Sequence, residues 1–386
     1  MNILIFGAGM MGKAIAYDLS HYSDFDAITI VDRDAKAVAM IDQFISDPRI
    51  KPLNIDVTKT EKIKKILMDH NIAVSALPYM FNYRLAKISI MTKTHFLDLG
   101  GNNDIVKKEI ALSKKAENKN VIVIPDCGLA PGLTSVITRD IVEKMEYVDY
   151  VKIRVGGLPL YPKPPLNYQI VFSPYGLINE YVEDAIVLDH GRILRKKSLT
   201  ELETIRFSRP FGKMEAFLTS GGCSTLPYIY KDKIGYLDYK TIRYPGHCEK
   251  FKLLVDLGLT KKEKINIKGK PIAPMDFLAK ILLENLPRNE PDVVLLKVLG
   301  EGVLNGEKHK VEYTMIDYYD EKNKTTAMMR TTGYPTSIIA QMIEKEDIVD
   351  RGVLTPEKVV PPDIMFEELK RRGIVIKRKI NGLGGI

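Results

Sequence analysis

The chain has 386 residues, more than one hydrophobic core usually organises, so we expect two domains. Apolar residues make up 45% and charged residues 27%, an ordinary globular composition that leaves little room for long disorder. The 57 Lys and Arg against 49 Asp and Glu give a net charge of +8, but the basic residues form short scattered groups. Neither interleaved aromatic residues nor a recognised nucleic-acid module accompanies them, so we expect no nucleic-acid partner.

The three cysteines are odd in number and lack a Cys-x-x-Cys spacing, which indicates neither a disulfide framework nor a metal site; they are Cys127, Cys223 and Cys248. Nowhere do about eighteen apolar residues run together, so no membrane segment is predicted. The first six residues lead directly into a glycine loop without a basic leader. We therefore expect a cytoplasmic protein.

The amino-terminal residues follow the order of a dinucleotide-binding motif. A short apolar run, Ile3–Phe6, predicts a strand, and a helical pattern begins at Lys13. Between them lies the sequence Gly7-Ala8-Gly9-Met10-Met11-Gly12. A second strand, predicted over Ala27–Val31, ends on Asp32, which lies 20 residues after the last glycine. Strand, glycine loop, helix and acidic residue thus occur in the spacing of the dinucleotide fingerprint.

Each glycine has a separate physical task in such a loop. Gly7 permits the sharp turn, Gly9 lets the backbone approach a pyrophosphate, and Gly12 lets the helix lie close to the strand. The helix amino terminus adds unpaired N–H groups and the positive end of its dipole. The predicted phosphate contacts are Gly7, Gly9, Met10, Met11 and Gly12.

The residues after the second strand bear on the choice of nucleotide. The Asp32 carboxylate can accept hydrogen bonds from both ribose hydroxyls and would repel a 2′-phosphate, which favours NAD over NADP. The neighbouring Arg33 keeps NADP open as an alternative. We therefore expect NAD as the cofactor, held at the ribose by these two residues.

Strands and helices continue to alternate up to about residue 130. Further short strands are predicted over Lys51–Ile55, Ile72–Ser75, His95–Asp98 and Val121–Ile124. This alternation predicts an α/β Rossmann domain with a doubly wound parallel sheet, in which ligands lie at the carboxyl ends of the strands. The residues expected there are Asp56, Val57, Ser75, Ala76, Leu77, Asp98, Leu99, Gly100, Asp126 and Cys127. Each of these segments could instead be only a strand-to-helix turn.

The pattern changes near Pro131, where a helix with apolar residues at every fourth position leads into long β-rich stretches. Strands are predicted over Tyr150–Val155, Tyr168–Phe172, Asp292–Val298, Lys310–Tyr318 and Thr325–Thr331. Several of them alternate apolar with polar residues, which indicates a second α+β domain with a largely antiparallel sheet. An apolar helix is expected from Ile338.

These patterns suggest three parts of the chain. Residues 1–130 form the NAD-binding Rossmann domain, residues 131–330 bind the substrate and form the dimer, and residues 331–386 return to the Rossmann domain. The open sheet of the second part has an edge and an outer face that need covering, so we expect a homodimer.

Two further motifs, Asp126-Cys127-Gly128-Leu129-Ala130-Pro131-Gly132 and Lys240-Thr241-Ile242-Arg243-Tyr244-Pro245-Gly246-His247, complete a resemblance. With the glycine loop, they make the chain similar to the saccharopine dehydrogenase-like family over nearly its whole length. Other segments look most like the family's lysine 6-dehydrogenases; they are Val155–Pro159, Glu215–Phe217 with Thr219–Gly222, His247–Phe251 and Arg330–Tyr334.

The resemblance implies NAD-dependent oxidative deamination of the lysine ε-amine, which gives ammonia and allysine, and the allysine cyclises to piperideine-6-carboxylate. Cys127 is a departure from the lysine enzymes, and a saccharopine-forming member also carries cysteine at this position. A saccharopine-forming or saccharopine-cleaving reductase is therefore the alternative within the family. A protein that senses NAD or an amino acid without turnover is the alternative outside catalysis.

Hydride transfer from an amine requires an uncharged amine, so a group must remove a proton from the ε-ammonium. The expected catalytic residues are His247, Asp98 and Asp126. His247 titrates nearest to neutrality, although a lone histidine is more often a structural donor. Arg243 would hold the substrate carboxylate through a bidentate fork, with a surface ion pair as the alternative.

The remaining substrate contacts are expected from polar loops and one thiol. Cys127 precedes a helix amino terminus, which would lower its pKa, but amine oxidation needs no covalent thiol. Packing or substrate contact is therefore its favoured role. Glu215, Thr219 and Thr331 lie in segments expected to line the substrate cleft, and glycine-rich turns explain those loops nearly as well.

Overall fold

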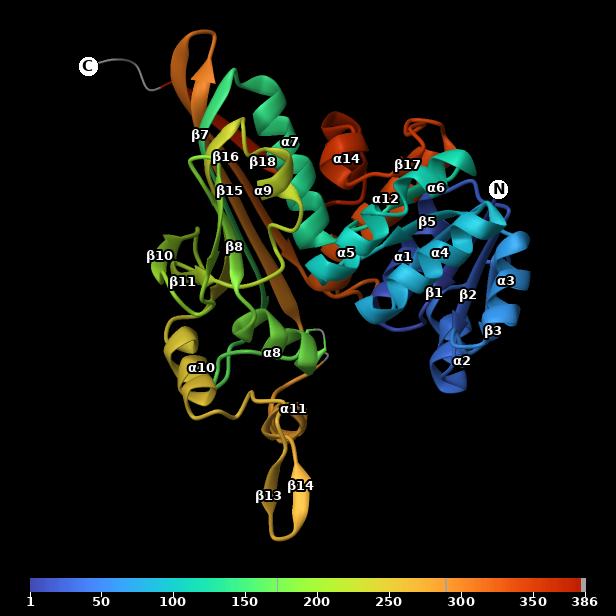
Figure 1. The fold of residues 1–386 in the computed structure, drawn as a ribbon, viewed down its shortest axis with the longest axis horizontal. Coiled ribbons are helices and arrows are strands. Elements are labelled where there is room, and N and C mark those ends of the chain that lie inside the picture. The colour runs from blue at the N-terminus through green and yellow to red at the C-terminus, as the bar shows by residue number, and fades with distance from the viewer. Residues whose placement is uncertain (172, 289, 383–386) are drawn as a thin grey trace. The chain divides into compact units, whose positions relative to one another are not determined.

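The computed structural model describes residues 1–171, 173–288 and 290–382, which divide into two compact units (Figure 1). The first unit contains Met1–Asp140 and Met329–Ile374. The second contains residues 141–328 and, at the end of the described chain, residues 375–382. No helix in the described ranges has the length and apolar character needed to cross a membrane.

The first unit is built on a seven-stranded parallel sheet in the order β17-β6-β5-β4-β1-β2-β3. The strands are β1 (Asn2–Phe6), β2 (Ala27–Asp32), β3 (Ile50–Asn54), β4 (Ile72–Ser75), β5 (His95–Asp98), β6 (Ile122–Ile124) and β17 (Gly352–Val353). The order runs outward from β1 to β3 and, in the other direction, from β4 to β6. This confirms the predicted doubly wound sheet, and its switch point lies between β1 and β4.

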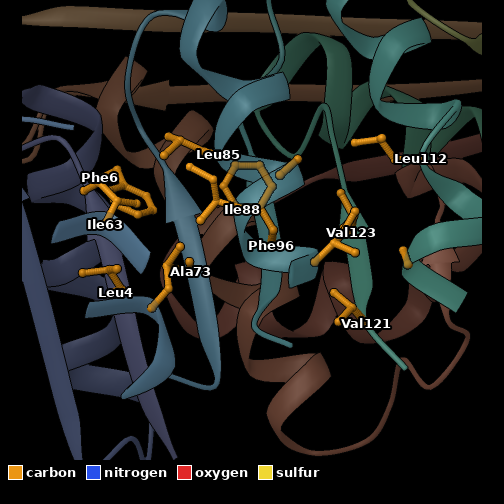
Figure 2. Close-up of a cluster of buried hydrophobic side chains, with 14 of the residues drawn as sticks. Leu4, Phe6, Ile63, Ala73, Leu85, Ile88, Phe96, Leu112, Val121 and Val123 are labelled. Carbon is orange, nitrogen blue, oxygen red and sulfur yellow. The ribbon is translucent and has the colours of Figure 1, made fainter. Parts of the chain in front are cut away.

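Helices lie between these strands and after the last of them along the chain. They are α1 (Met10–Tyr22), α2 (Ala35–Phe44), α3 (Thr60–Met68), α4 (Asn82–Thr92), α5 (Asn103–Ile110), α6 (Ser113–Asn118), α7 (Thr134–Lys144), α12 (Ala327–Glu344), α13 (Pro356–Val359) and α14 (Pro362–Arg371), with the short turns η1 (Tyr79–Phe81) and η2 (Leu129–Leu133). The end of α7 and the first two residues of α12 belong to the second unit. Figure 2 shows one core cluster, in which Phe6 and Phe96 from the strands pack with Ile63 of α3 and Leu85 of α4. Apolar burial of this kind holds the helices on the sheet.

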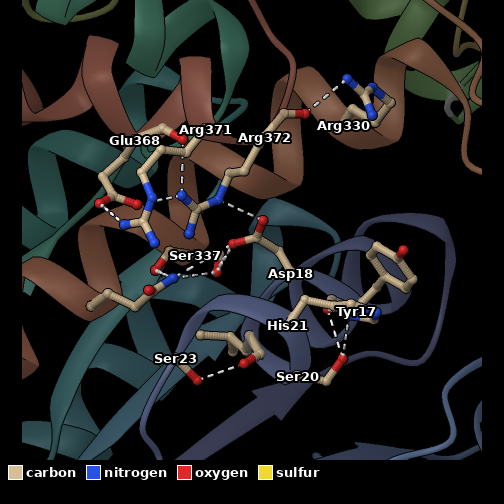
Figure 3. Close-up of polar contacts among 12 residues, drawn as sticks. Tyr17, Asp18, Ser20, His21, Ser23, Arg330, Ser337, Glu368, Arg371 and Arg372 are labelled. Atoms are coloured by element: carbon tan, nitrogen blue, oxygen red, sulfur yellow. Dashed lines mark hydrogen bonds and ion pairs between the residues drawn. The ribbon is translucent and has the colours of Figure 1, made fainter.

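The last helices of the first unit are joined to α1 by a buried polar network (Figure 3). The Asp18 carboxylate accepts hydrogen bonds from Ser337 Oγ and Arg372 Nε, each at 2.6 Å. Arg372 also forms an ion pair with Glu368, and the side chains of Asp18 and Arg372 are completely buried. This network explains why the chain returns to the Rossmann unit after leaving it.

The second unit contains a nine-stranded sheet whose main path is β10-β11-β12-β7-β15-β16-β18, with β8 and β9 attached to β12. The strands are β7 (Tyr147–Pro159), β8 (Ala185–Asp189), β9 (Arg192–Lys196), β10 (Glu203–Arg206), β11 (Lys213–Leu218), β12 (Ile234–Arg243), β15 (Asp292–Leu304), β16 (Glu307–Tyr318) and β18 (Lys377–Gly382). All pairs are antiparallel except β12 with β7. The predicted α+β domain with a largely antiparallel sheet is therefore confirmed.

Four helices and a hairpin complete the second unit. The helices are α8 (Pro174–Val182), α9 (Leu226–Ile229), α10 (His247–Asp256) and α11 (Pro274–Asn285), and the hairpin pairs β13 (Ile265–Ile267) with β14 (Lys270–Ile272). Side chains of α8, α10 and α11 form one apolar cluster with Tyr168 and Phe217. Helix α8 is thereby fixed on the part of the sheet that carries β11 and β12.

Several sequence-based boundaries differ from the structure. The first unit extends to Asp140, because α7 begins at Thr134 within it, and the returning segment ends at Ile374. Residues 377–382 instead form β18, which pairs with β16 of the second unit, so the predicted return of residues 331–386 is wrong for this stretch. In the predicted strand 168–172, Ile170 forms only an isolated bridge with Arg288, and Phe172 lies outside the described residues.

The predicted strand Thr325–Thr331 is wrong, because α12 begins there. The Asp292 carboxylate, at the start of β15, accepts hydrogen bonds from the backbone N–H groups of Ala327 (2.6 Å) and Met328 (2.9 Å). A carboxylate that satisfies first-turn N–H groups stabilises a helix start. The helix then continues through Pro335, so its start is also earlier than the predicted Ile338.

The buried ion pair of the first unit makes a testable prediction about stability. Arg372→Met leaves the Asp18 carboxylate buried without its cation and should lower the free energy of unfolding by about 3–5 kcal/mol. The double variant Asp18→Asn/Arg372→Met removes both charges and should recover part of this loss. Urea unfolding measures both values. A double variant that loses as much stability as Arg372→Met, or more, would show that the unpaired Asp18 carboxylate is not the source of the loss.

Candidate functional site

The glycine loop has the geometry that a pyrophosphate requires. Gly7 has a φ of +105°, and a Cβ added to Gly12 would lie 1.8 Å from the Gly7 carbonyl oxygen, so both positions demand glycine for the fold itself. Gly9, by contrast, has no heavy atom within 4 Å of an added Cβ. It is the N-cap of α1, and no side chain caps the N–H groups that follow at Met10 and Met11. The loop therefore offers free N–H groups and open space to a phosphate.

Asp32 lies beside this loop, at the end of β2. Its carboxylate accepts hydrogen bonds from the backbone N–H groups of Ala8 (2.8 Å) and Asp34 (2.9 Å). Asp32 is half-buried and the next residue, Arg33, is exposed. Asp32 therefore fixes the glycine loop and also lies at the position from which a fingerprint carboxylate contacts the ribose.

Side chains after β3 and β4 are already engaged within the unit. The N–H of Thr58 donates to Asp56 Oδ1 at 2.8 Å and lowers the pKa of that carboxyl. Val57 packs in the core cluster, and the buried Ser75 hydroxyl donates to Asn82 Oδ1 at 2.8 Å. These predicted cofactor residues can therefore contribute mainly backbone atoms to a ligand.

The switch point of the sheet is formed by close backbone approach. An added Cβ at Gly7 would lie 2.9 Å from the carbonyl oxygen of Ala76 and 3.3 Å from Leu77. After β5, Leu99 is half-buried and Gly100 has a φ of +73°. The predicted cofactor residues that follow β1, β4 and β5 thus come together at the carboxyl ends of these strands.

Three carboxyl groups lie buried together beyond the ends of β5 and β6. Asp98 accepts a hydrogen bond from the Gly100 N–H at 2.7 Å, and Asp126 packs so closely on Gly100 that an added Cβ would lie 1.9 Å from its Oδ1. Burial raises the pKa of Asp98 to about 6. The third group is Glu109 of α5, whose pKa is raised to about 10 by burial and by the charges of Asp98 and Asp126. At neutral pH Glu109 is therefore protonated.

Glu109 was not predicted from the sequence, and only Asp98 and Asp126 were expected here. The available signal was its position on α5, three residues after the buried Val106 and so on the same helix face. Asp98 and Asp126 do lie together as predicted, but they are 0% and 2% exposed. In this conformation the Asp98 carboxylate holds the loops that follow β5 and β6, because it accepts from the N–H groups of Gly100 (2.7 Å) and Asp126 (3.4 Å).

Cys127 lies next to these carboxyl groups and is completely buried. Its thiol donates to the Ile124 carbonyl oxygen at 3.2 Å, and burial together with the nearby carboxylates raises its pKa well above the ordinary value. The Cys127 carbonyl oxygen accepts a hydrogen bond from Thr336 of α12 at 2.8 Å. These contacts support packing over nucleophilic chemistry. The predicted Thr331 is also completely buried in α12.

In the second unit, Arg243 is held by aromatic and carbonyl groups. Its Nε donates to the Tyr181 hydroxyl at 2.8 Å and its Nη1 to the Ile242 carbonyl oxygen at 2.9 Å. The guanidinium lies over the ring of Tyr168, 4.9 Å from its centroid. Burial disfavours the charge, but Tyr181, Tyr168 and Glu180 more than offset this, so the pKa of Arg243 is raised. The alternative role, a surface ion pair, is not seen among the described residues, and Arg243 is buried.

His247 continues this chain of hydrogen bonds. Its Nε2 lies 3.0 Å from the Tyr181 hydroxyl and its Nδ1 lies 2.9 Å from the Leu166 carbonyl oxygen. Since Arg243 can only donate and a carbonyl can only accept, Tyr181 donates to Nε2, and Nδ1 carries the proton. Burial and the Arg243 charge lower the pKa of His247 to about 3. In this conformation His247 is neutral, and its contacts support a positioning role over the expected acid–base role.

The other predicted substrate residues divide between two roles. The Glu215 carboxylate accepts hydrogen bonds from the N–H groups of Gly246 (2.9 Å) and Cys248 (2.6 Å), so it fixes the start of α10 and is not open to substrate. Thr219 lies in a polar cluster, where its hydroxyl is 2.7 Å from the Thr241 hydroxyl and 3.3 Å from Glu180 Oε1. No local sequence pattern marked Glu180, because tertiary packing alone brings α8 to β12.

No group of three or more His, Cys, Asp or Glu side chains suited to a metal ion occurs in the ranges 1–171, 173–288 and 290–382. The three cysteines are free and buried.

Comparison with known proteins gives two family matches. The profile described as the saccharopine dehydrogenase NADP binding domain matches residues 3–124, and that of the saccharopine dehydrogenase C-terminal domain matches residues 128–374. Together they cover most of both units.

Individual relatives match over the full length at low identity. A saccharopine dehydrogenase [NADP(+), L-glutamate-forming] of Saccharomyces cerevisiae is 23% identical over 98% of this chain and 99% of its own. A carboxyaminopropylagmatine dehydrogenase of Synechocystis is 22% identical over 99% and 98%. The structure of the apo yeast enzyme has a TM-score of 0.81 at 20% identity, with 98% and 99% of the two chains covered. The homospermidine synthase of Legionella pneumophila has a TM-score of 0.70 at 14% identity, covering 98% and 91%.

The different surroundings of Gly9 and Gly12 predict that substitution of Gly9 weakens binding and that substitution of Gly12 impairs folding. Gly9→Ala places its methyl group in the open space of the loop, so the variant should melt like the parent and bind dinucleotide at least about tenfold more weakly. Gly12→Ala, the matched control, should destabilise the unit itself, because its Cβ would overlap the Gly7 carbonyl oxygen. Thermal melting and fluorescence titration with NADH measure the two effects. Parent-like binding by Gly9→Ala would place the phosphate elsewhere.

The buried Glu109 predicts a pH-dependent cost in stability. Its folded pKa of about 10 lies above the ordinary 4.5, so unfolding releases its proton between these values. Stability therefore falls as pH rises, by up to about 1.4 kcal/mol per pH unit. Glu109→Gln should remove this cost and gain stability over the parent, more at about pH 9 than at about pH 5.

Urea unfolding across this pH range measures the gain. The control is Glu117→Gln on α6, an exposed carboxyl whose pKa is lowered by Lys114. That variant should show no growing gain with pH. A constant difference between Glu109→Gln and the parent would show that Glu109 is ionised in the folded protein.

Proposed function

This chain belongs to the saccharopine dehydrogenase family, and we propose that it is an NAD-dependent dehydrogenase of the side-chain amine of L-lysine. In the overall reaction, the ε-ammonium of lysine, NAD⁺ and water give allysine, ammonium, NADH and a proton. NAD supplies the acceptor for the hydride that leaves Cε. Water then adds to the resulting imine, ammonia departs, and the allysine cyclises to piperideine-6-carboxylate.

The observation that carries the proposal is the state of the buried cations in the second unit. Among its described residues, the buried Lys and Arg side chains are Arg154, Lys240 and Arg243. Arg154 forms ion pairs with Asp238 and Glu203, and Lys240 pairs with Glu203. Arg243 alone has no carboxylate partner in the described part of this unit. One open buried cation matches the single carboxylate of lysine better than the three carboxylates of saccharopine.

The chain's own residues then divide the work. Arg243 would hold the α-carboxylate, with Tyr181 and His247 fixing the plane of its guanidinium. Asp98 and Asp126 stay our proposed proton acceptors, because the raised pKa of Asp98, about 6, is closer to neutral pH than that of an ordinary carboxyl.

NAD is favoured over NADP by one feature of the nucleotide-binding loop. The Asp32 carboxylate lies beside the glycine loop, where it would repel a 2′-phosphate. The matching domain profile is named for NADP and the yeast relative uses NADP(+), so NADP is the alternative. The exposed Arg33 is the residue that would contact the additional phosphate.

A saccharopine reductase is the second candidate, because several relatives are named saccharopine dehydrogenase [NADP(+), L-glutamate-forming]. Against it, the alignment with the yeast enzyme runs over 462 positions, more than the 386 residues of this chain, so the yeast enzyme has segments that this chain lacks. This difference in length argues against transferring the substrate of the yeast enzyme to this chain. A homodimer and a cytoplasmic location stay predictions; the fully exposed edge strand β18 supports the first.

The deciding experiment measures reduction of both nucleotides with purified protein. Lysine, ornithine, saccharopine and other amino acids are each supplied with NAD or NADP, and absorbance of the reduced nucleotide is followed. We expect lysine with NAD to be the fastest pair. Saccharopine as the only active compound would establish the reductase, and binding without turnover of any compound would establish a sensing protein.

A further inference from the structure

Two opposite charges are held side by side on the packed surfaces of α8 and β12. Helix α8 carries Glu180 next to Tyr181, and strand β12 carries Thr241 and Arg243 two residues apart, which places both on one face of the sheet. The Tyr181 hydroxyl accepts from Arg243 Nε at 2.8 Å, and the Thr241 hydroxyl donates to Glu180 Oε1 at 2.7 Å. Neighbouring residues of the helix thus hold neighbouring positions of the strand.

Each of the two charged groups retains unused hydrogen-bonding capacity. Arg243 uses Nε and Nη1, while its Nη2 donates to no described residue. Glu180 accepts through Oε1 from Thr241 and Thr219, while its Oε2 accepts from no described residue. Glu180 and Arg243 do not form an ion pair with each other, although Glu180 is close enough to help raise the pKa of Arg243. A free donor and a free acceptor of opposite charge therefore lie near one another.

The fixed cation of Arg243 and the fixed anion of Glu180 are complementary to the two charges of an amino-acid zwitterion. In a free α-amino acid, a carboxylate and an ammonium are attached to the same carbon, so a fixed cation and a fixed anion can each take one of them. We propose that Glu180 binds the α-ammonium of the substrate while Arg243 binds its α-carboxylate. The contact of Arg243 with the α-carboxylate rests on the proposed function. The substrates are then amino acids with a free α-amino group.

The proposed contact also explains which amine would react. An α-ammonium held by the Glu180 carboxylate stays protonated, and a protonated amine cannot lose hydride from its carbon. The side-chain amine, four methylene groups away in lysine, has no such partner in this pair. Glu180 would thus be a specificity-determining residue that directs oxidation to the distal amine and rejects acids that carry no α-ammonium.

The test is calorimetric titration of the protein with lysine, saccharopine and 6-aminohexanoate, a lysine analogue that keeps the carboxylate and lacks the α-ammonium. The parent should bind lysine or saccharopine at least about tenfold more tightly than 6-aminohexanoate. Glu180→Gln keeps the shape and hydrogen-bonding atoms but removes the charge. It should weaken the α-amino acids about tenfold and leave 6-aminohexanoate within about twofold. Glu183→Gln, at an exposed position one turn along the same chain segment, is the control and should change neither.

Three results overturn the inference. They are equal binding of lysine and 6-aminohexanoate by the parent, equal weakening of both by Glu180→Gln, and no binding of any α-amino acid. The parent's preference is measured without a variant, so a variant that does not fold leaves the test intact. Reduction of NAD is measured separately. Correct binding selectivity without turnover of lysine would disprove the proposed function and leave the role of Glu180 standing.

Discussion

The chemistry of the second unit depends on a guanidinium that is buried without a carboxylate to neutralise it. Such a charge is costly unless other groups solvate it. Here a hydroxyl, a carbonyl and the face of an aromatic ring take over that task around Arg243. Burial keeps His247 neutral, and the Arg243 charge adds to this effect, because a second positive charge beside the first would be repelled. A histidine that looks like a proton carrier in the sequence therefore becomes part of the frame that orients an arginine.

The first unit has an excess of buried acidic groups at its candidate site. Three carboxyl groups gather beyond β5 and β6, and the structure limits their mutual repulsion by keeping a proton on Glu109. Cys127 lies in the same field, which disfavours its thiolate. The first unit thus gathers carboxyl groups at its candidate residues, while Arg243 places a buried positive charge in the second. These signs suit the partners we infer, an anionic group at Arg243 and a proton at the carboxyl cluster.

Features set by neighbouring residues could be predicted from the sequence, and those set by distant contacts could not. The strands Ile72–Ser75 and His95–Asp98 were predicted at their observed bounds, because apolar runs and turns are local signals. The start of α12 was missed because its cap is Asp292, far away in sequence. Glu180 was missed for the same reason. Glu215 was expected to be open to substrate, but folding brings it to the start of α10.

The network around Asp18 also has a consequence for the order of synthesis. Asp18 and Arg372 are separated by 354 positions, and residues 141–328 of the second unit are encoded between them. During translation, α1 therefore emerges long before the helices that neutralise and cover its buried carboxylate. The first unit cannot reach its final structure on the ribosome until Arg372 has left the exit tunnel, so its partly folded form must wait while residues 141–328 of the second unit are made.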